Sequence, residues 1–91
     1  MAVQHDAAKQ EFTLTKAGHT GELAYARPAG GSIDFTHAFV EEALRGQGVA
    51  DELARAALAF AHQEKLNVKT SCTFMAGFVS RHPAEYADLL A

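Results

Sequence analysis

The chain has 91 residues, of which 48% are hydrophobic and 21% charged, and this size and composition predict one compact domain over residues 1–91. Eleven acidic residues against eight lysines and arginines give a formal net charge of −3. The basic residues are scattered, which argues against a nucleic-acid partner or a polybasic membrane surface. Residues 1–12 are too polar for a signal peptide, and no apolar run approaches the roughly 18 residues of a spanning helix. A cytoplasmic location is expected.

The cysteine and the histidines do not form the pattern of a metal site. A single cysteine, Cys72, excludes an intramolecular disulfide and a site of several thiolates. The histidines lack the i,i+4 pairing of helical zinc ligands. The sequence therefore predicts no metal; the histidines concerned are His5, His19, His37, His62 and His82.

Two segments near the start of the chain predict a β-hairpin. Residues 11–15 and residues 22–27 each alternate polar and apolar side chains, so that the apolar ones share one face. Gly18 and Gly21 lie between the two segments and are expected to form the turn.

A third strand follows the densest turn signal in the sequence, residues 28–32. Residues 33–40 carry large apolar side chains two or four positions apart, among them Phe35 and Phe39. This spacing predicts an antiparallel strand with both phenylalanines on one face.

The strongest helix signal covers residues 49–65. Asp51 and Glu52 in the first turn and Lys65 at the end suit the helix dipole. Apolar residues recur at intervals of three and four, as on one face of an amphipathic helix. That face comprises Val49, Leu53, Ala56, Ala57, Phe60 and Ala61.

The remaining segments complete a mixed sheet. Residues 68–74 alternate and predict a fourth strand, which the helical crossover places parallel to the third. Residues 75–82 and 83–90 predict two short helical stretches, the second with Pro83 at its first position. The expected fold is α+β (α/β-like), with a mixed antiparallel and parallel sheet, one long packed helix and short C-terminal helices. Where parallel strands separate, such a sheet leaves a ligand crevice.

Residues 45–50 lie between the third strand and the long helix, where that crevice is expected. Gly46 and Gly48 allow a tight turn and a close approach of the backbone to a ligand. The first amides of a helix have no internal partners and lie at the positive end of its dipole, so a phosphate can accept hydrogen bonds from them. The loop lacks the terminal lysine of a nucleotide loop and the third glycine of a dinucleotide fingerprint. The segment therefore predicts an anion site of another kind.

The pattern Arg45-x-x-Gly48-x-Ala50 resembles the pyrophosphate loop for coenzyme A in the GNAT acyltransferase superfamily. The resemblance covers residues 11–90 and is to the small single-domain N-acetyltransferase-like branch. The segments that carry it, in chain order, are residues 37–40, residues 44–50, Leu53, Ala57, residues 71–72 and residues 82–83.

This resemblance implies a minimal core that binds acetyl-CoA or coenzyme A as a cosubstrate. The donor would be a small-molecule acyl-CoA and the acceptor an unidentified amine; the oligomeric state stays open. The pantetheine arm is expected along the backbone of the third strand and the diphosphate on the loop. The implied binding residues are Phe39, Val40, Arg45, Gly46, Gln47, Gly48, Val49 and Ala50.

Three residues are candidates for catalysis. The resemblance marks Cys72 as a proposed catalytic thiol, whereas a buried small hydrophobe is the alternative interpretation. His37 is expected on the face of Phe35, as a hydrogen-bonded sheet histidine or as a general base. His82 either caps a helix end or lines the acceptor cleft. Glu41, at the strand end, is expected to be solvated.

Two functions follow from these observations. The first is an N-acetyltransferase in which the amine attacks acetyl-CoA directly or attacks an acetyl group carried by Cys72. The second is a module that binds coenzyme A or an acyl-CoA as a sensor, without turnover.

Overall fold

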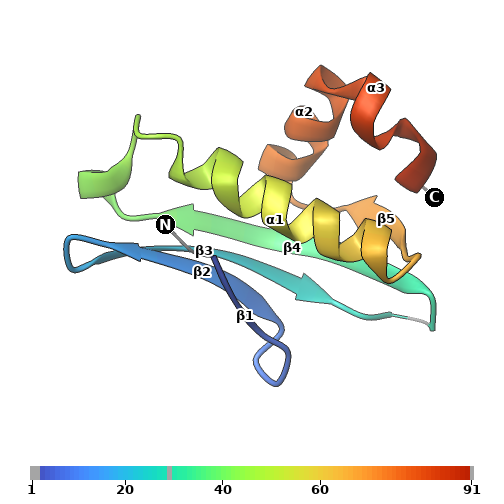
Figure 1. Cartoon of the computed structure of the whole chain (residues 1–91), viewed down its shortest axis with the longest axis horizontal. Coiled ribbons are helices and arrows are strands. Elements are labelled where there is room, and N and C mark those ends of the chain that lie inside the picture. Colours follow the sequence, from blue (N-terminus) through green and yellow to red (C-terminus); the bar gives the residue numbers. More distant parts are fainter. Residues whose placement is uncertain (1–2, 29, 91) are drawn as a thin grey trace.

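A five-stranded sheet in the order β1-β2-β3-β4-β5 forms the base of the structure (Figure 1). The computed structural model describes residues 3–28 and 30–90, so the expected turn at 28–32 lies partly outside the described residues. The first four strands are antiparallel neighbours, and β5 pairs parallel with β4. The α+β class is confirmed. The strands are β1 (Gln4–Asp6), β2 (Glu11–Lys16), β3 (His19–Ala26), β4 (Ser32–Val40) and β5 (Asn67–Thr70).

The helices lie on one face of this sheet. Figure 1 shows α1 running alongside β4, with α2 and α3 beyond it. The apolar residues that alternate along the strands are buried beneath the helices, and the residues between them are partly or fully exposed. The helical elements are η1 (Glu42–Leu44), α1 (Val49–Gln63), α2 (Thr73–Arg81), α3 (Pro83–Tyr86) and η2 (Ala87–Leu89).

Helix α1 matches the expected helix at its start and ends two residues earlier than expected, at Gln63. Its side chains at Leu53, Ala57 and Leu58 are at most 2% exposed, which places the apolar face on the sheet. The three- and four-residue spacing of the apolar side chains predicted this helix correctly because the pattern holds over four helical turns.

Strand β4 contains a bulge that changes which side chains face the core. Phe35 pairs with Tyr25 and His37 pairs with Ala24, so Thr36 is an extra residue in β4. A bulge shifts the alternation by one position. The expectation that Phe39 and His37 share the buried face of Phe35 is therefore wrong, and both point to the uncovered face.

Strand β5 is shorter than expected. The alternation over 68–74 does not continue the strand, because the chain leaves the sheet after Thr70 and starts α2 at Thr73. The Asp34 carboxylate accepts hydrogen bonds from the Ser71 N–H at 3.1 Å and the Ser71 hydroxyl at 2.8 Å. These bonds hold the turn, and Cys72 becomes the N-cap of α2.

The expected hairpin is confirmed with Gly18 in its turn, whereas Gly21 lies inside β3, so the expectation is wrong for Gly21 alone. A Cβ atom at Gly21 would lie 2.8 Å from Cγ1 of Val49, at the start of α1. The missing side chain allows the helix to approach the sheet closely at this point.

The short strand β1 was not expected, because its three residues are polar and exposed. His5 fixes it to the sheet. Its ring stacks on Phe12 with 4.2 Å between centroids, and its Nε2 lies 2.6 Å from the Tyr25 hydroxyl. Burial raises the pKa of Tyr25 above its ordinary value of 10.0.

Candidate functional site

The loop that precedes α1 has the backbone geometry of an anion site. Gly46 and Gly48 adopt φ angles of 80° and 78°, in the left-handed region that favours glycine. Gly48 is also the N-cap of α1, and its carbonyl accepts the first helical hydrogen bond, from the Glu52 N–H at 3.0 Å. The two glycines therefore turn the chain directly into the helix.

The amides of residues 46–51 have no hydrogen-bond acceptor within residues 3–28 and 30–90. They lie at the positive end of a 15-residue helix. A pocket of about 360 Å³ opens at this point. Donors without partners at a helix start, beside a pocket, can bind a phosphate group. The pocket is lined by Val40, Leu44, Arg45, Gly46, Gly48, Val49, Ala50 and Asp51.

Two long side chains hold the loop in place. The Arg45 Nε donates to the Val40 carbonyl at 3.1 Å, and the Gln47 Nε2 donates to the Ala43 carbonyl at 2.9 Å. Both side chains therefore support the loop through its backbone. Because the Val40 carbonyl already accepts a hydrogen bond from Arg45, a ligand that donates to this carbonyl would do so alongside Arg45.

Glu41 anchors the end of β4 and is more than a solvated strand end. Its carboxylate accepts the Thr20 N–H at 2.6 Å and lies 3.2 Å from the Nδ1 of His19. The His19 contact and the Thr20 amide hold the pKa of Glu41 below its ordinary value of 4.5. The pairing of β3 with β4 brings Glu41 to His19 and Thr20, and the local sequence around Glu41 does not reveal these contacts.

Strands β4 and β5 separate where the ligand crevice was expected. The two strands pair only as far as Phe35 and Thr70, after which the Cys72 N–H donates to the Phe35 carbonyl at 2.8 Å. Beyond Phe35, β4 continues to Val40 with no pairing to β5 in the described part of the chain. This edge of β4 spans about 17 Å at roughly 3.3 Å per residue. It joins the position of Cys72 to the loop at the start of α1.

The three catalytic candidates lie apart from one another. Cys72 is 8% exposed and makes no hydrogen bond to a side chain of the described residues. His37 is exposed on the sheet face that the helices leave uncovered. His82 follows the last residue of α2, whose nine residues span about 13 Å. Among the described residues, no hydrogen bond joins the Cys72 thiol to a histidine.

His82 has a packing role in the structure. Its Nδ1 lies 2.9 Å from the Phe78 carbonyl, and its ring packs on Phe78 with 4.5 Å between centroids. The guanidinium carbon of Arg55 lies 5.5 Å from the centre of the Phe78 ring. This arrangement agrees with the helix-capping interpretation of His82.

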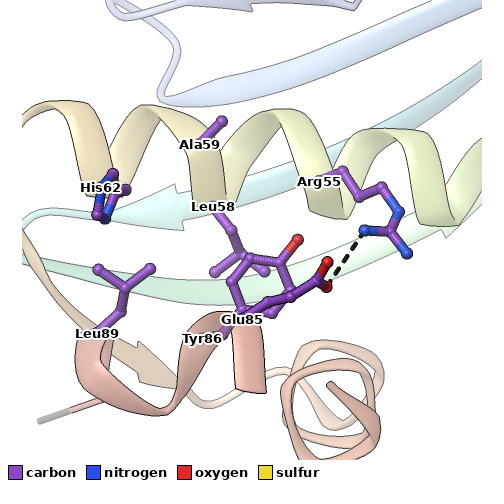
Figure 2. A pocket seen from close by; sticks show the side chains of 7 residues that line it. All are labelled: Arg55, Leu58, Ala59, His62, Glu85, Tyr86 and Leu89. Atoms are coloured by element: carbon purple, nitrogen blue, oxygen red, sulfur yellow. Dashed lines mark hydrogen bonds and ion pairs between the residues drawn. The ribbon is translucent and has the colours of Figure 1, made fainter. Parts of the chain in front are cut away.

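A second pocket, of about 250 Å³, lies between α1 and the C-terminal helices. Figure 2 shows the Arg55 side chain reaching Glu85 across its mouth, where Nη1 and Oε2 are 3.4 Å apart. Leu58 and Leu89 form its apolar wall. The amides of residues 46–51 do not line this pocket, so the phosphate-binding geometry is found at the pocket beside the start of α1.

Among residues 3–28 and 30–90, no group of three or more His, Cys, Asp or Glu side chains is arranged to hold a metal ion. The helices in the same residues lack the length and apolar composition that a membrane crossing requires.

Comparison with known proteins identifies one family. The family model described as GCN5-related N-acetyl-transferase matches residues 11–89. Protein NATD1 of Bos taurus is 34% identical over 83 residues, which are 89% of this chain and 74% of that protein. Protein NATD1 of Homo sapiens is 32% identical over 83 residues, with the same two coverages.

A solved structure supports the fold. The NMR structure of a GCN5-like protein from Staphylococcus aureus superimposes with a TM-score of 0.72. It covers 99% of this chain and 87% of its own, at 22% sequence identity.

Proposed function

Because the chain belongs to the GCN5-related N-acetyltransferase family, we propose that it binds acetyl-CoA at the loop before α1 and transfers the acetyl group to an amine. Membership places the chain among the acyltransferases. The observation that carries the proposal for this chain is the run of amides at residues 46–51, which lack acceptors among the described residues.

Acetyl-CoA suits the shape of the candidate site. The diphosphate would accept hydrogen bonds from the backbone between Gly46 and Ala50, with Gln47 and Val49 in the same turn. The pantetheine arm would lie along the unpaired edge of β4, past Phe39 and Val40. An extended arm in this direction carries the thioester toward Cys72.

The acyl transfer has two routes from this arrangement. In the direct route, the amine nitrogen bonds to the thioester carbon, the C–S bond breaks, and the coenzyme A thiolate leaves while the amine loses a proton. In the second route, the Cys72 thiol loses its proton and its sulfur attacks first, which releases coenzyme A. The amine then attacks the acetyl-cysteine and restores the thiol.

The two histidines serve the direct route differently. His37 lies on the part of β4 beyond its pairing with β5 and faces solvent, so it can take a proton from an amine that arrives at the uncovered face. The Nδ1 of His82 is engaged with the Phe78 carbonyl, and the residue lies at the far end of α2. We therefore propose His37 as the better placed base.

Intact-mass analysis after incubation with acetyl-CoA, without acceptor, separates the two routes. The Cys72 route predicts a gain of one acetyl group that Cys72→Ala abolishes together with turnover. The Cys72→Ala variant should keep its affinity for coenzyme A and most of its stability, because a small side chain replaces another. Turnover by Cys72→Ala would assign the chemistry to the direct route, and His37→Ala should then lower kcat.

A coenzyme A binding module is the second candidate. The observation that favours it is the separation of Cys72, His37 and His82, which leaves no assembled pair of nucleophile and base among the described residues. Such a module would bind coenzyme A and acetyl-CoA with similar affinity. It would release no free thiol from acetyl-CoA with any amine offered.

A further inference from the structure

One face of the sheet has no helix packed on it among the described residues, and we call it the open face. Its residues alternate with the core residues along β1 to β5, and none of them is buried. Four of them are carboxylates and one, Lys69, is a lysine. The open face comprises Gln4, Asp6, Glu11, Thr13, Thr15, Thr20, Glu22, Ala24, Ala26, Ser32, Asp34, His37, Phe39, Asn67 and Lys69.

The centre of the open face combines an aromatic ring with free carboxylates. Phe39 is 46% exposed, and Glu22 is its partner in the β3–β4 register. Glu11 lies one strand further, paired with Ala24. Neither Glu11 nor Glu22 has an ion-pair partner among the described residues. A carboxylate beside an exposed ring provides both charge and cation–π attraction for an ammonium group.

The charge of the open face selects the kind of partner. Phosphate-bearing partners, whether nucleic acids or phospholipids, would be repelled by the carboxylates. A second copy of the chain would place one acidic face against another, and like charges oppose such an interface. A cationic partner is complementary.

The shape of the open face favours an extended partner over a small molecule. The two pockets described above lie at the start of α1 and between α1 and the C-terminal helices, so neither opens on this face. Small ligands require a concave site that covers most of their surface. A sheet face without a pocket and with carboxylates on neighbouring strands instead suits a peptide that contacts several of them.

We propose that the open face docks a lysine-rich peptide segment, with lysine ammonium groups at Glu11 and Glu22 and an aliphatic lysine stem on Phe39. Docking itself is independent of acyl transfer. The further statement that a docked lysine is the acetyl acceptor rests on the proposed function, since Phe39 lies on the unpaired part of β4 along which the pantetheine arm would lie.

Fluorescence anisotropy with a labelled octalysine peptide tests the docking. The wild-type chain should bind the peptide, with an affinity that falls as ionic strength rises. The double variant Glu11→Gln/Glu22→Gln should weaken binding about fivefold, because two exposed ion pairs are lost. A double variant on the helical side, Glu64→Gln/Asp88→Asn, changes the net charge equally and should bind as the wild type does.

Three results would overturn the proposal: no binding of octalysine, equal weakening in both double variants, or tight binding of spermine without binding of the peptide. A thermal-shift measurement with acetyl-CoA keeps the two proposals separate. Glu11→Gln/Glu22→Gln should retain the wild-type shift. Octalysine binding without any acetyl-CoA shift would reject the proposed function and leave the docking surface standing.

Discussion

Glu41 shows how one side chain connects the hairpin to the candidate site. Its backbone N–H donates to the Thr20 carbonyl at 3.2 Å, and its carboxylate accepts the Thr20 N–H in return. The residue directly precedes η1, which leads to the glycine loop. Glu41 therefore fixes the point from which the loop departs.

The pH dependence of stability should reveal this role. The lowered pKa of Glu41 means that its stabilising contribution is present above the ordinary value of 4.5 and is lost as pH falls through the folded-state pKa. Glu41→Gln should therefore have a lower Tm than the wild type at pH 7, and the difference should shrink below pH 4.5. Glu64→Gln, an exposed change at the end of α1, should show no such convergence. A Tm difference that is constant down to acid pH would contradict the charge-based explanation.

Single residues of the site were predictable to different degrees. Gly46 and Gly48 were correctly singled out as turn glycines, because their position before a helix signal is a local property. The orientation of His37 could not be predicted from the sequence, because it depends on one extra residue in β4 and on the register with β3. The position of Cys72 at a helix start depends on the Asp34–Ser71 contact, which joins residues far apart in sequence.

At the scale of elements, the close contact between α1 and β3 positions the loop. A Cβ atom at Gly21 would approach Val49 Cγ1 to 2.8 Å and Leu53 Cδ1 to 3.2 Å. Gly21→Ala should therefore push the first turn of α1 from the sheet and lower the free energy of unfolding by about 1–3 kcal/mol, as overpacking does. Urea denaturation measures this loss. An unchanged midpoint would show that Val49 and Leu53 can repack without cost.

The elements that were wrongly predicted share a physical cause. The alternation over 68–74 resembles a strand, but side-chain period alone does not report where the partner strand ends. Helix α1 was predictable because its apolar face is continuous over four turns. Strand β1 has no apolar pattern of its own and is held by the contact of His5 with Phe12 and Tyr25.

At the scale of the whole molecule, the sheet separates two kinds of surface. The helical face buries the apolar core and holds the loop with its free amides at the start of α1. The open face carries carboxylates. In the proposed function, an anionic cosubstrate and a cationic acceptor would thus approach different surfaces that meet at the edge of β4, which keeps their opposite charges from competing for one site.

Ligand-linked stability tests the loop in the intact molecule. A ligand that binds only the folded state at about 100 times its Kd adds about 2.7 kcal/mol of stability. For a domain of this size, that corresponds to a rise in Tm of roughly 10–20 °C. Differential scanning fluorimetry of the wild type with acetyl-CoA should show a rise of this order, and a flat Tm at millimolar acetyl-CoA would reject the loop as a binding site.

A matched pair of glycine variants separates binding from strain. Gly48 and Gly18 have φ angles of 78° and 79°, and a Cβ atom at either would meet nothing within 4 Å. Each alanine substitution should therefore cost about 1–2 kcal/mol, because both force a side chain into the left-handed region. Only Gly48→Ala places a methyl group in the pocket where the diphosphate would approach, whereas Gly18 lies in the β2–β3 turn. Gly18→Ala should keep the full rise in Tm with acetyl-CoA and Gly48→Ala should lose most of it; equal rises in the two variants would exclude close contact between the ligand and Gly48.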